Sequence, residues 1–192
     1  MKSLILACIL LVMGATACSD TKKKKPITGE VADTTSFYPI APYILSQLKY
    51  FDSMHVKYSV VSTEGAQKDS ITSQIATVMP IIQTFIDADI SDPIQKKNYR
   101  ETVFRDAGTA SFNINYTPIN RNAPVSNIDI LMDEQTSIIK RIFVRKQYLN
   151  KDTTCIEQLS WKTNEGFTKS ISKETNTGFS LNKTIAVRVI LP

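Results

Sequence analysis

The apolar residues of this chain change their spacing near residue 110, and that change limits the folds that the chain can adopt. Upstream, residues 37–51 repeat apolar side chains every three or four positions, as on one face of an amphipathic helix. Downstream, apolar and polar residues alternate, for example along residues 111–117, as in a strand with one buried face. Helices followed in sequence by strands favour an α+β fold over a parallel α/β fold. We therefore predict two or three N-terminal helices packed on one face of an antiparallel β-meander of about six strands.

Three helices are predicted in the first part of the chain. The first covers about residues 39–53. The second follows the apolar spacing of residues 71–86, and we expect Pro80 to kink or split it because proline lacks an amide donor. The third starts after the capping residue Asp92 and runs to about residue 104. Between the first two helices, residues 56–60 alternate and predict a short strand.

The strands of the predicted meander follow one another through the rest of the chain. They are separated by short stretches that carry turn residues such as asparagine and glycine. The expected strands cover residues 111–117, 127–133, 138–148, 155–162, 167–174 and 184–191.

The second and third of these strands are predicted to pair as a hairpin around a short loop at residues 135–137. A register in which Glu134 pairs with Ile138 sets Leu131 opposite Arg141 on the outer face. It also puts branched residues on the face that the helices cover, namely Ile128, Ile130, Ile142 and Val144. A slip of one residue would bury Arg141 and expose its apolar neighbours, so burial should decide the register.

The N-terminus has the pattern of a secretory signal peptide over residues 1–17. Its apolar run, residues 4–12, is too short to span a bilayer, and small residues follow it. The residues before Cys18 resemble a bacterial lipobox, which predicts that the Cys18 thiol is acylated and that Cys18 becomes the new N-terminus. Because Ala15 and Ala17 also suit an ordinary signal peptidase, a secreted soluble protein with an unmodified Cys18 remains the alternative.

Residues 18–36 lack an apolar period and are predicted to form a flexible tether that leads to a single domain, residues 37–192. The lysines at residues 22–25 suit anionic headgroups, and they equally suit a solvated, extended linker. The net charge of +5 is mild, acidic and basic residues are interspersed, and no zinc-ligand spacing occurs. Together with export, these features argue against nucleic acid as a partner.

The sequence predicts no catalytic, cofactor-binding or metal-binding residue. His55 is the sole histidine and has no ligand-spaced neighbours, and the glycines form neither a nucleophile elbow nor a phosphate cradle. The carboxylates Asp87, Asp89 and Asp92 lack the spacing of a calcium loop, and Asp92 already serves as a helix cap. Cys155 has no partner for a disulfide once Cys8 and Cys18 are assigned to the leader and the anchor, and we expect it to be buried and inert.

Two aromatic residues are also candidates for a binding site. Trp161 and Phe167 flank the turn at residues 164–166, where they can form a pair that stacks on a carbohydrate. The commoner role of such residues is to fill the core between a sheet and its helices, and that role is the one we expect.

Several segments together carry a resemblance to a group of bacterial proteins. They are the signal with Cys18, "FYPIAPYILSQL", "DADISDP", "IDILMDEQTSIIKRIFV" and "LSWKT". In this combination the chain resembles small lipoproteins of unknown function from Bacteroidota envelopes. The resemblance implies a compartment and a domain but no chemistry.

The resemblance also implies two properties of the mature protein. Similar lipoproteins reach the cell surface through acidic residues after the cysteine; here only Asp20 precedes the lysines, so we expect an outer-membrane anchor that faces the periplasm. The same lineage O-glycosylates short motifs of aspartate, serine or threonine, and a small or apolar residue. The matching acceptors in this chain are Thr34, Ser53, Ser70 and Thr153.

These observations leave three classes of function open. The first, which we favour, is a non-enzymatic envelope protein that is anchored to the membrane through Cys18 and contacts another envelope protein or component. The second is a periplasmic carrier or sensor that holds an apolar ligand between a curved sheet and its helices. The third is an enzyme whose carboxylates cannot be paired from the sequence.

Overall fold

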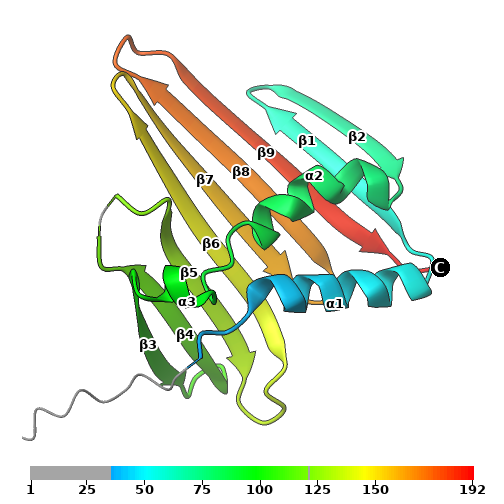
Figure 1. The fold of residues 1–192 in the computed structure, drawn as a ribbon. Helices are drawn as coiled ribbons and strands as arrows, with labels where there is room; N and C mark the ends of the chain where they lie inside the picture. Colours follow the sequence, from blue (N-terminus) through cyan, green and yellow to red (C-terminus); the bar gives the residue numbers. More distant parts are fainter. Residues whose placement is uncertain (1–35, 121) are drawn as a thin grey trace, which may run out of the picture. The chain divides into compact units, whose positions relative to one another are not determined.

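The computed structural model describes residues 36–120 and 122–192, which fold into one sheet with helices on one of its faces (Figure 1). The predicted signal peptide, Cys18, the lysines at 22–25 and the acceptor Thr34 lie outside the described residues. The predictions that concern them therefore stay predictions.

The sheet is antiparallel and contains nine strands in the order β2-β1-β9-β8-β7-β6-β5-β4-β3. From β3 to β9 each strand pairs with the next one along the chain, whereas β1 pairs with the last strand, β9. Thus the α+β class and the antiparallel meander are confirmed, but the count of about six strands is wrong. The strands are β1 (Lys57–Glu64), β2 (Gln67–Ser73), β3 (Tyr99–Asp106), β4 (Ser111–Pro118), β5 (Val125–Asp133), β6 (Ile139–Asn150), β7 (Thr153–Lys162), β8 (Gly166–Thr175) and β9 (Ser180–Ile190).

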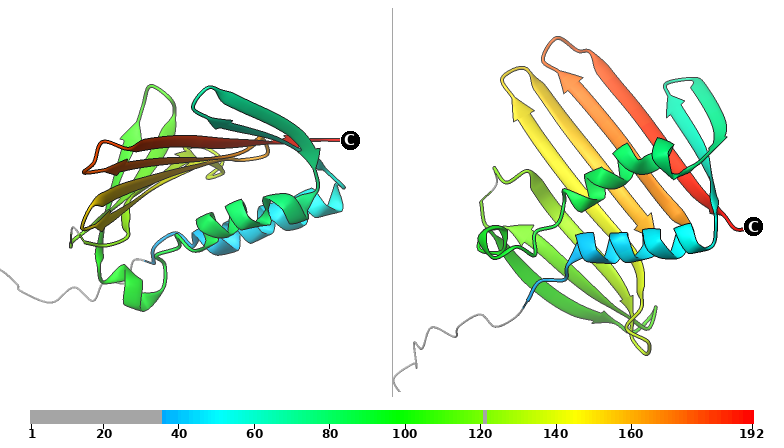
Figure 2. Two further views of the ribbon diagram at one scale, coloured as in Figure 1. Left: turned by 90° about the horizontal axis from the view of Figure 1, so that it is seen from above. Right: turned by 45° about the vertical axis from the view of Figure 1, so that its right-hand side comes forward.

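Two long helices lie side by side against one face of the sheet, as both views of Figure 2 show. They are α1 (Ile40–Ser53) and α2 (Ile75–Ile86), and each points its buried residues at the sheet. Of the two effects expected of Pro80, the split is wrong, because α2 runs continuously through this residue. The third helix, α3 (Pro93–Lys96), is a single short turn that Asp92 caps by accepting the backbone amide of Ile94 at 2.8 Å.

Two segments predicted as helix are strands at the two edges of the sheet. Ile71 belongs to β2, where it pairs with Val60 of β1 across a tight turn that contains Gly65. Residues 99–104 belong to β3, which pairs with β4 along its whole length. In both segments apolar residues stand four positions apart, which fits a helix, but backbone pairing with the neighbouring strand outweighs that local pattern.

Aromatic rings fill the space between the sheet and the two long helices. Trp161 and Phe167 stack with their ring centroids 5.0 Å apart, and Phe85 of α2 meets Trp161 edge-on at 5.6 Å. Trp161 is fully buried and Phe167 is 3% exposed, so these two residues belong to the core and do not form a carbohydrate platform. Fully buried branched residues complete the interior, among them Ile40, Ile44, Ile82, Ile128, Ile130, Ile142 and Val144.

The predicted β5–β6 register is confirmed from Asn127 to Leu131, but the predicted pair of Glu134 with Ile138 is wrong, because Ile138 lies opposite Asp133. Ile128 pairs with Val144, Ile130 with Ile142, and Leu131 with Arg141, which is exposed. A bulge follows, because Met132 pairs with Ile139 and leaves Lys140 as the extra residue. In the turn, Asp133 accepts a hydrogen bond from the backbone amide of Thr136 and forms an ion pair with Lys140. Both contacts lower the pKa of the Asp133 carboxyl.

Candidate functional site

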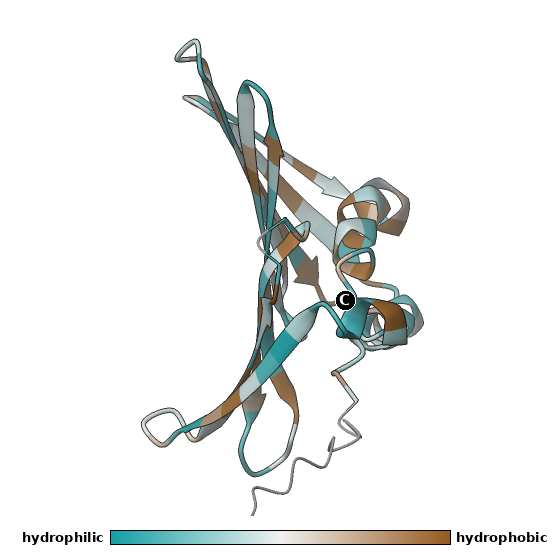
Figure 3. Cartoon of the chain, turned by 60° about the vertical axis from the view of Figure 1, so that its left-hand side comes forward, coloured by the Kyte–Doolittle hydropathy of each residue, from teal (hydrophilic) through white to brown (hydrophobic). Residues whose placement is uncertain are grey.

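One face of the sheet carries the helices, and the opposite face has none of the described residues over it. Figure 3 shows the sheet nearly edge-on with the helices against one side. Because side chains alternate along a strand, the residues next to the buried core positions all point to this second face, which we call the open face. On β6, for example, Ile142 and Val144 are buried, whereas Arg141 just before them is exposed and Phe143 and Arg145 are half-buried.

The strand registers align basic residues of the open face across the middle of the sheet. Arg141 of β6 pairs with Lys162 of β7, Lys162 with Gly166 of β8, and Gly166 with Arg188 of β9. We call these four positions, Arg141, Lys162, Gly166 and Arg188, the cationic row. The row crosses four neighbouring strands at right angles to their length, so its three charged side chains are exposed on one line.

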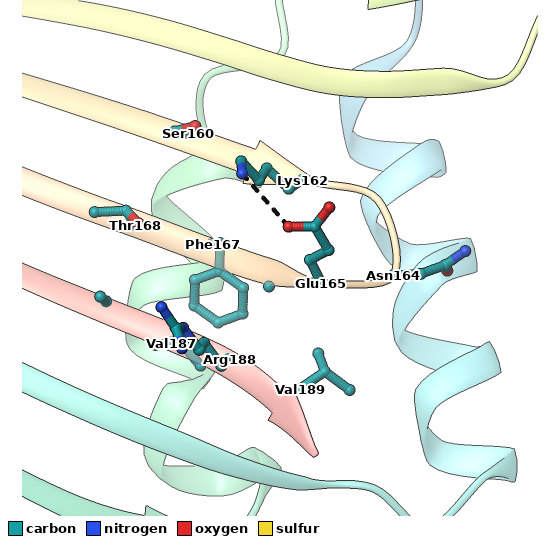
Figure 4. A pocket seen from close by; sticks show the side chains of 11 residues that line it. Ser160, Lys162, Asn164, Glu165, Phe167, Thr168, Val187, Arg188 and Val189 are labelled. Carbon is teal, nitrogen blue, oxygen red and sulfur yellow. Dashed lines mark hydrogen bonds and ion pairs between the residues drawn. The ribbon is translucent and has the colours of Figure 1, made fainter. Parts of the chain in front are cut away.

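A hollow of about 540 Å³ opens on this face at three positions of the cationic row, Lys162, Gly166 and Arg188. Figure 4 shows its lining, in which Lys162, Glu165 and Arg188 stand near the shorter side chains of Ser160 and Thr168. Gly166 belongs to the lining of this hollow and lies very close to the backbone of β9. A Cβ atom there would lie 2.1 Å from the backbone carbonyl oxygen of Val187, and Gly166 has φ of 142°, so this position is built for glycine.

The three charged side chains of the row have weak partners or none. Lys162 forms a 3.4 Å ion pair with Glu165, but both side chains are more than half exposed and water screens the pair. Arg141 donates a 3.0 Å hydrogen bond from Nε to Ser160 Oγ and lies over the ring of Phe143. Arg188 makes no hydrogen bond or ion pair through its side chain with any residue that the structure describes.

Two further hollows lie beside the first on the open face. One, of about 230 Å³, is lined mainly by hydroxyl and amide side chains together with Arg145. Within it, the hydroxyl oxygens of Ser170 and Thr184 form a 3.1 Å hydrogen bond, and the Ser172 hydroxyl donates a 2.8 Å hydrogen bond to Asn182 Oδ1. The other, of about 400 Å³, is lined by Asn113, Asp129, Leu131, Arg141 and Phe143.

The aspartates that the sequence singled out accept hydrogen bonds from other groups of this chain. Asp89 accepts the amide of Ala41 at 2.8 Å and that of Ser91 at 2.7 Å, and thereby ties the start of α1 to the loop after α2. Asp92 caps α3 as predicted, and Asp87 accepts a 2.8 Å hydrogen bond from Gln83. Each carboxylate therefore has a structural role. The described residues include no group of three His, Cys, Asp or Glu side chains placed to hold a metal ion.

The remaining candidates from the sequence are scattered over the molecule. His55 lies exposed just after α1, with a left-handed backbone, beside a hollow of about 260 Å³. Cys155 is a half-buried free thiol on β7, not the buried one that we expected. Of the proposed glycosylation acceptors, Ser53 and Ser70 are exposed and Thr153 is half-buried. The structure brings none of these residues into the cationic row.

A second group of charges lies on the helix-covered face. Lys146 is only 6% exposed, and its ammonium donates a 2.9 Å hydrogen bond to the carbonyl oxygen of Thr84 near the end of α2. Burial lowers the pKa of the Lys146 ammonium. Beside it, Lys169 and Glu157 form a 3.3 Å ion pair. The Lys146 ammonium therefore links α2 to β6, and the Lys169–Glu157 pair joins β8 to β7.

No family model, curated protein or solved structure matches this chain. No helix among residues 36–120 and 122–192 is both long enough and apolar enough to cross a membrane. The open face is a site that we did not predict from the sequence. The signal was present in the alternation of Arg141, Phe143 and Arg145 with buried residues, but the row appears only when the registers of four strands are combined.

Proposed function

We propose that this chain is a non-enzymatic interaction module of the cell envelope, which is held at a membrane by an acylated Cys18 and binds another envelope component on its open face. The observation that carries this proposal is the open face itself. A nine-stranded sheet that is covered on one side offers a wide, preformed surface, and this one has three adjoining hollows with exposed basic side chains.

The interior favours this function over that of a carrier for an apolar ligand. A carrier needs an apolar cavity of several hundred Å³ between sheet and helices. In this chain Trp161, Phe167 and Phe85 pack ring against ring in that space, and the large hollow lies on the other side of the sheet with polar residues in its lining. We propose no catalytic activity, because Asp89 and Asp92 bind backbone amides and Asp87 accepts a hydrogen bond from the side chain of Gln83.

The anchor and the compartment rest on the sequence alone. We propose that the mature protein sits at the periplasmic side of the outer membrane, since Asp20 is the one acidic residue between Cys18 and the lysines. Replacing Cys18 (Cys18→Ala) removes the site of acylation. We expect the variant to leave the membrane fraction of its native host for the soluble fraction. If it stays with the membrane while its leader is cleaved, the lipid anchor is refuted.

Site-specific photo-cross-linking in living cells tests the binding surface. A photoreactive phenylalanine analogue at Thr168 stands in the middle of the open face, and the same analogue at Ser46 stands on the exposed side of α1. We expect one reproducible cross-linked species from Thr168 and none of that size from Ser46. Cross-linking at Ser46 with none at Thr168 would place the contact elsewhere and refute the open face as the binding surface.

A further inference from the structure

We propose that the cationic row is a binding site for an acidic polysaccharide, which lies across strands β6 to β9 with its anionic groups on Arg141, Lys162 and Arg188. This inference rests on the proposed function, because it names the chemical class of the partner that the open face binds. It draws on the spacing of the row, on the charge around it and on the lining of the hollows.

The spacing of the row suits a chain with repeated charges. Neighbouring strands lie about 4.8 Å apart, so the three strand steps from Arg141 to Arg188 span about 14 Å. One phosphate or carboxylate group reaches two of these side chains at most. A linear polymer with an anionic group on successive units reaches all of them, and it runs along the row, perpendicular to the strands.

The charge of the open face is mainly positive on β6 to β9, although Asp129 of the neighbouring β5 shares a hollow with Arg141. On β6 to β9 the basic residues at open-face positions are Arg141, Arg145, Lys162 and Arg188, and the carboxylate at such a position is Glu174, near the far end of β8. Glu165 reaches the row from the turn between β7 and β8. Its exposed ion pair with Lys162 is weak, so an anionic ligand can displace it.

The hollows offer the groups that sugar hydroxyls bind. Ser160 and Thr168 line the large hollow next to the row, and Ser170, Thr184 and Gln158 line the adjoining one. Hydroxyl and amide groups both donate and accept hydrogen bonds, as sugar hydroxyls do.

The same features argue against an acidic protein. Stable protein interfaces have an apolar, well-packed centre with aromatic anchors. At the centre of β7 and β8 on the open face stand Ser160, Thr168 and Gly166. The exposed large apolar residues of this face lie at its margins, namely Phe104 on the edge strand β3, Leu149 near the end of β6 and Ile190 at the end of β9. A protein partner and an anionic lipid bilayer are therefore outcomes that the test must separate from a polysaccharide.

The test measures binding of full-length protein to defined polymers by calorimetry at low and physiological salt. The probes are polygalacturonate and dextran sulfate, with neutral dextran, poly-glutamate, single-stranded DNA and phosphatidylglycerol-containing vesicles for comparison. The first variant combines Arg141→Gln, Lys162→Gln and Arg188→Gln. The control removes the same charge at exposed lysines elsewhere, through Lys49→Gln, Lys97→Gln and Lys151→Gln.

We expect the row variant to lose at least about tenfold in affinity for the acidic polysaccharides, and the control variant less than about threefold, with both melting as the wild type does. We also expect Glu165→Gln to bind about two- to threefold more tightly, because it removes the carboxylate that competes for Lys162. A general loss of stability cannot produce that gain.

Three results would overturn the inference. One is a failure to bind either acidic polysaccharide, another is equal loss in the row and control variants, and the third is tighter binding to poly-glutamate, DNA or vesicles than to the polysaccharides. If any of these occurs while cross-linking at Thr168 succeeds, the open face still binds a partner, but of another class. If that cross-link also fails, the proposed function fails with it.

Discussion

Trp161 is the residue whose replacement best tests how the helices are held on the sheet. Its ring is fully buried, stacks on Phe167 and meets Phe85 of α2 edge-on. Replacing a buried tryptophan by alanine costs about 3–5 kcal/mol through lost burial and the cavity left behind. Since a domain of this size is stable by about 5–15 kcal/mol, Trp161→Ala should remove a large part of that stability.

The expected loss converts into a measurable change of melting temperature. For a domain of 150–250 residues each kcal/mol corresponds to about 2–4 °C, so Trp161→Ala should melt about 6–20 °C below the wild type. Circular dichroism gives the melting temperature, and urea unfolding gives the free energy, with an unchanged m-value showing that the folded state is intact. As a control, Phe179→Ala removes a ring that is 59% exposed and should stay within about 0.5 kcal/mol.

A second substitution at the same position separates ring packing from the polar atom of the indole. No described residue accepts a hydrogen bond from Trp161 Nε1, and a buried unpaired donor costs about 1–3 kcal/mol. Trp161→Phe removes that donor and loses about 1 kcal/mol of packing, so it should lie within about 1 kcal/mol of the wild type or above it. If Trp161→Ala loses less than about 1 kcal/mol, or Trp161→Phe loses as much as alanine, the aromatic stack does not hold the helices.

Three other substitutions probe the sheet and its charges. Gly166→Ala should lower the free energy of unfolding in urea by at least about 2 kcal/mol, because its Cβ would meet a backbone carbonyl of β9. Gly178 also has positive φ but has open space around it, so Gly178→Ala should lose less stability, and the reverse order would contradict the close approach at Gly166. The Asp133 carboxyl has a lowered pKa in the folded state, so its contribution to stability is present above its unfolded pKa near 3.8 and fades as the pH falls below that value. The amount by which Asp133→Asn melts below the wild type should therefore shrink between pH 6 and pH 2, and a constant difference would show that the charge of Asp133 does not stabilise the fold. Burial lowers the pKa of Lys146, so the folded state disfavours its ammonium, and this cost is relieved as the pH rises through the folded pKa toward 10.5. The melting temperature of Lys146→Met relative to the wild type should therefore fall between pH 8 and pH 10.5, and a rise would refute a lowered pKa at Lys146.

The sequence was informative where one spacing dominates. The alternation of Ile128 and Ile130 with polar neighbours predicted β5 and its register with β6, because only one pairing buries the branched residues and exposes Arg141. The apolar stripe of α1 was equally clear. By contrast, Ile71 and Ile75 fit one helix face equally well, and what assigns Ile71 to a strand is pairing with Val60 across the turn at Gly65. That contact lies outside any local window.

The candidate site depends on relations that no single segment contains. Arg141 and Arg188 are far apart in the chain and stand in one line only because each hairpin turn between β6 and β9 fixes the register of the next strand. A shift of one residue in any of these turns would move an arginine to the covered face. The composition of each strand predicted that one side would be polar, but not that the basic residues would align.

The pairing of β1 with β9 sets the order in which this chain can assemble during synthesis. β1 can join the rest of the sheet only after β9 has been synthesised, because β9 (Ser180–Ile190) is the strand that pairs β1 with the rest of the sheet. At about 5–20 residues per second, the ribosome needs about 6–25 s to move from the end of β1 to the end of β9. For that time the β1–β2 hairpin lacks its long-range partner, and the apolar sides of α1 and α2 lack the strands β6 to β9 that bury them. The sheet is therefore completed only after β9 is synthesised, and in a chain that stops before β9 the strands β1 and β2 cannot pair with the rest of the sheet.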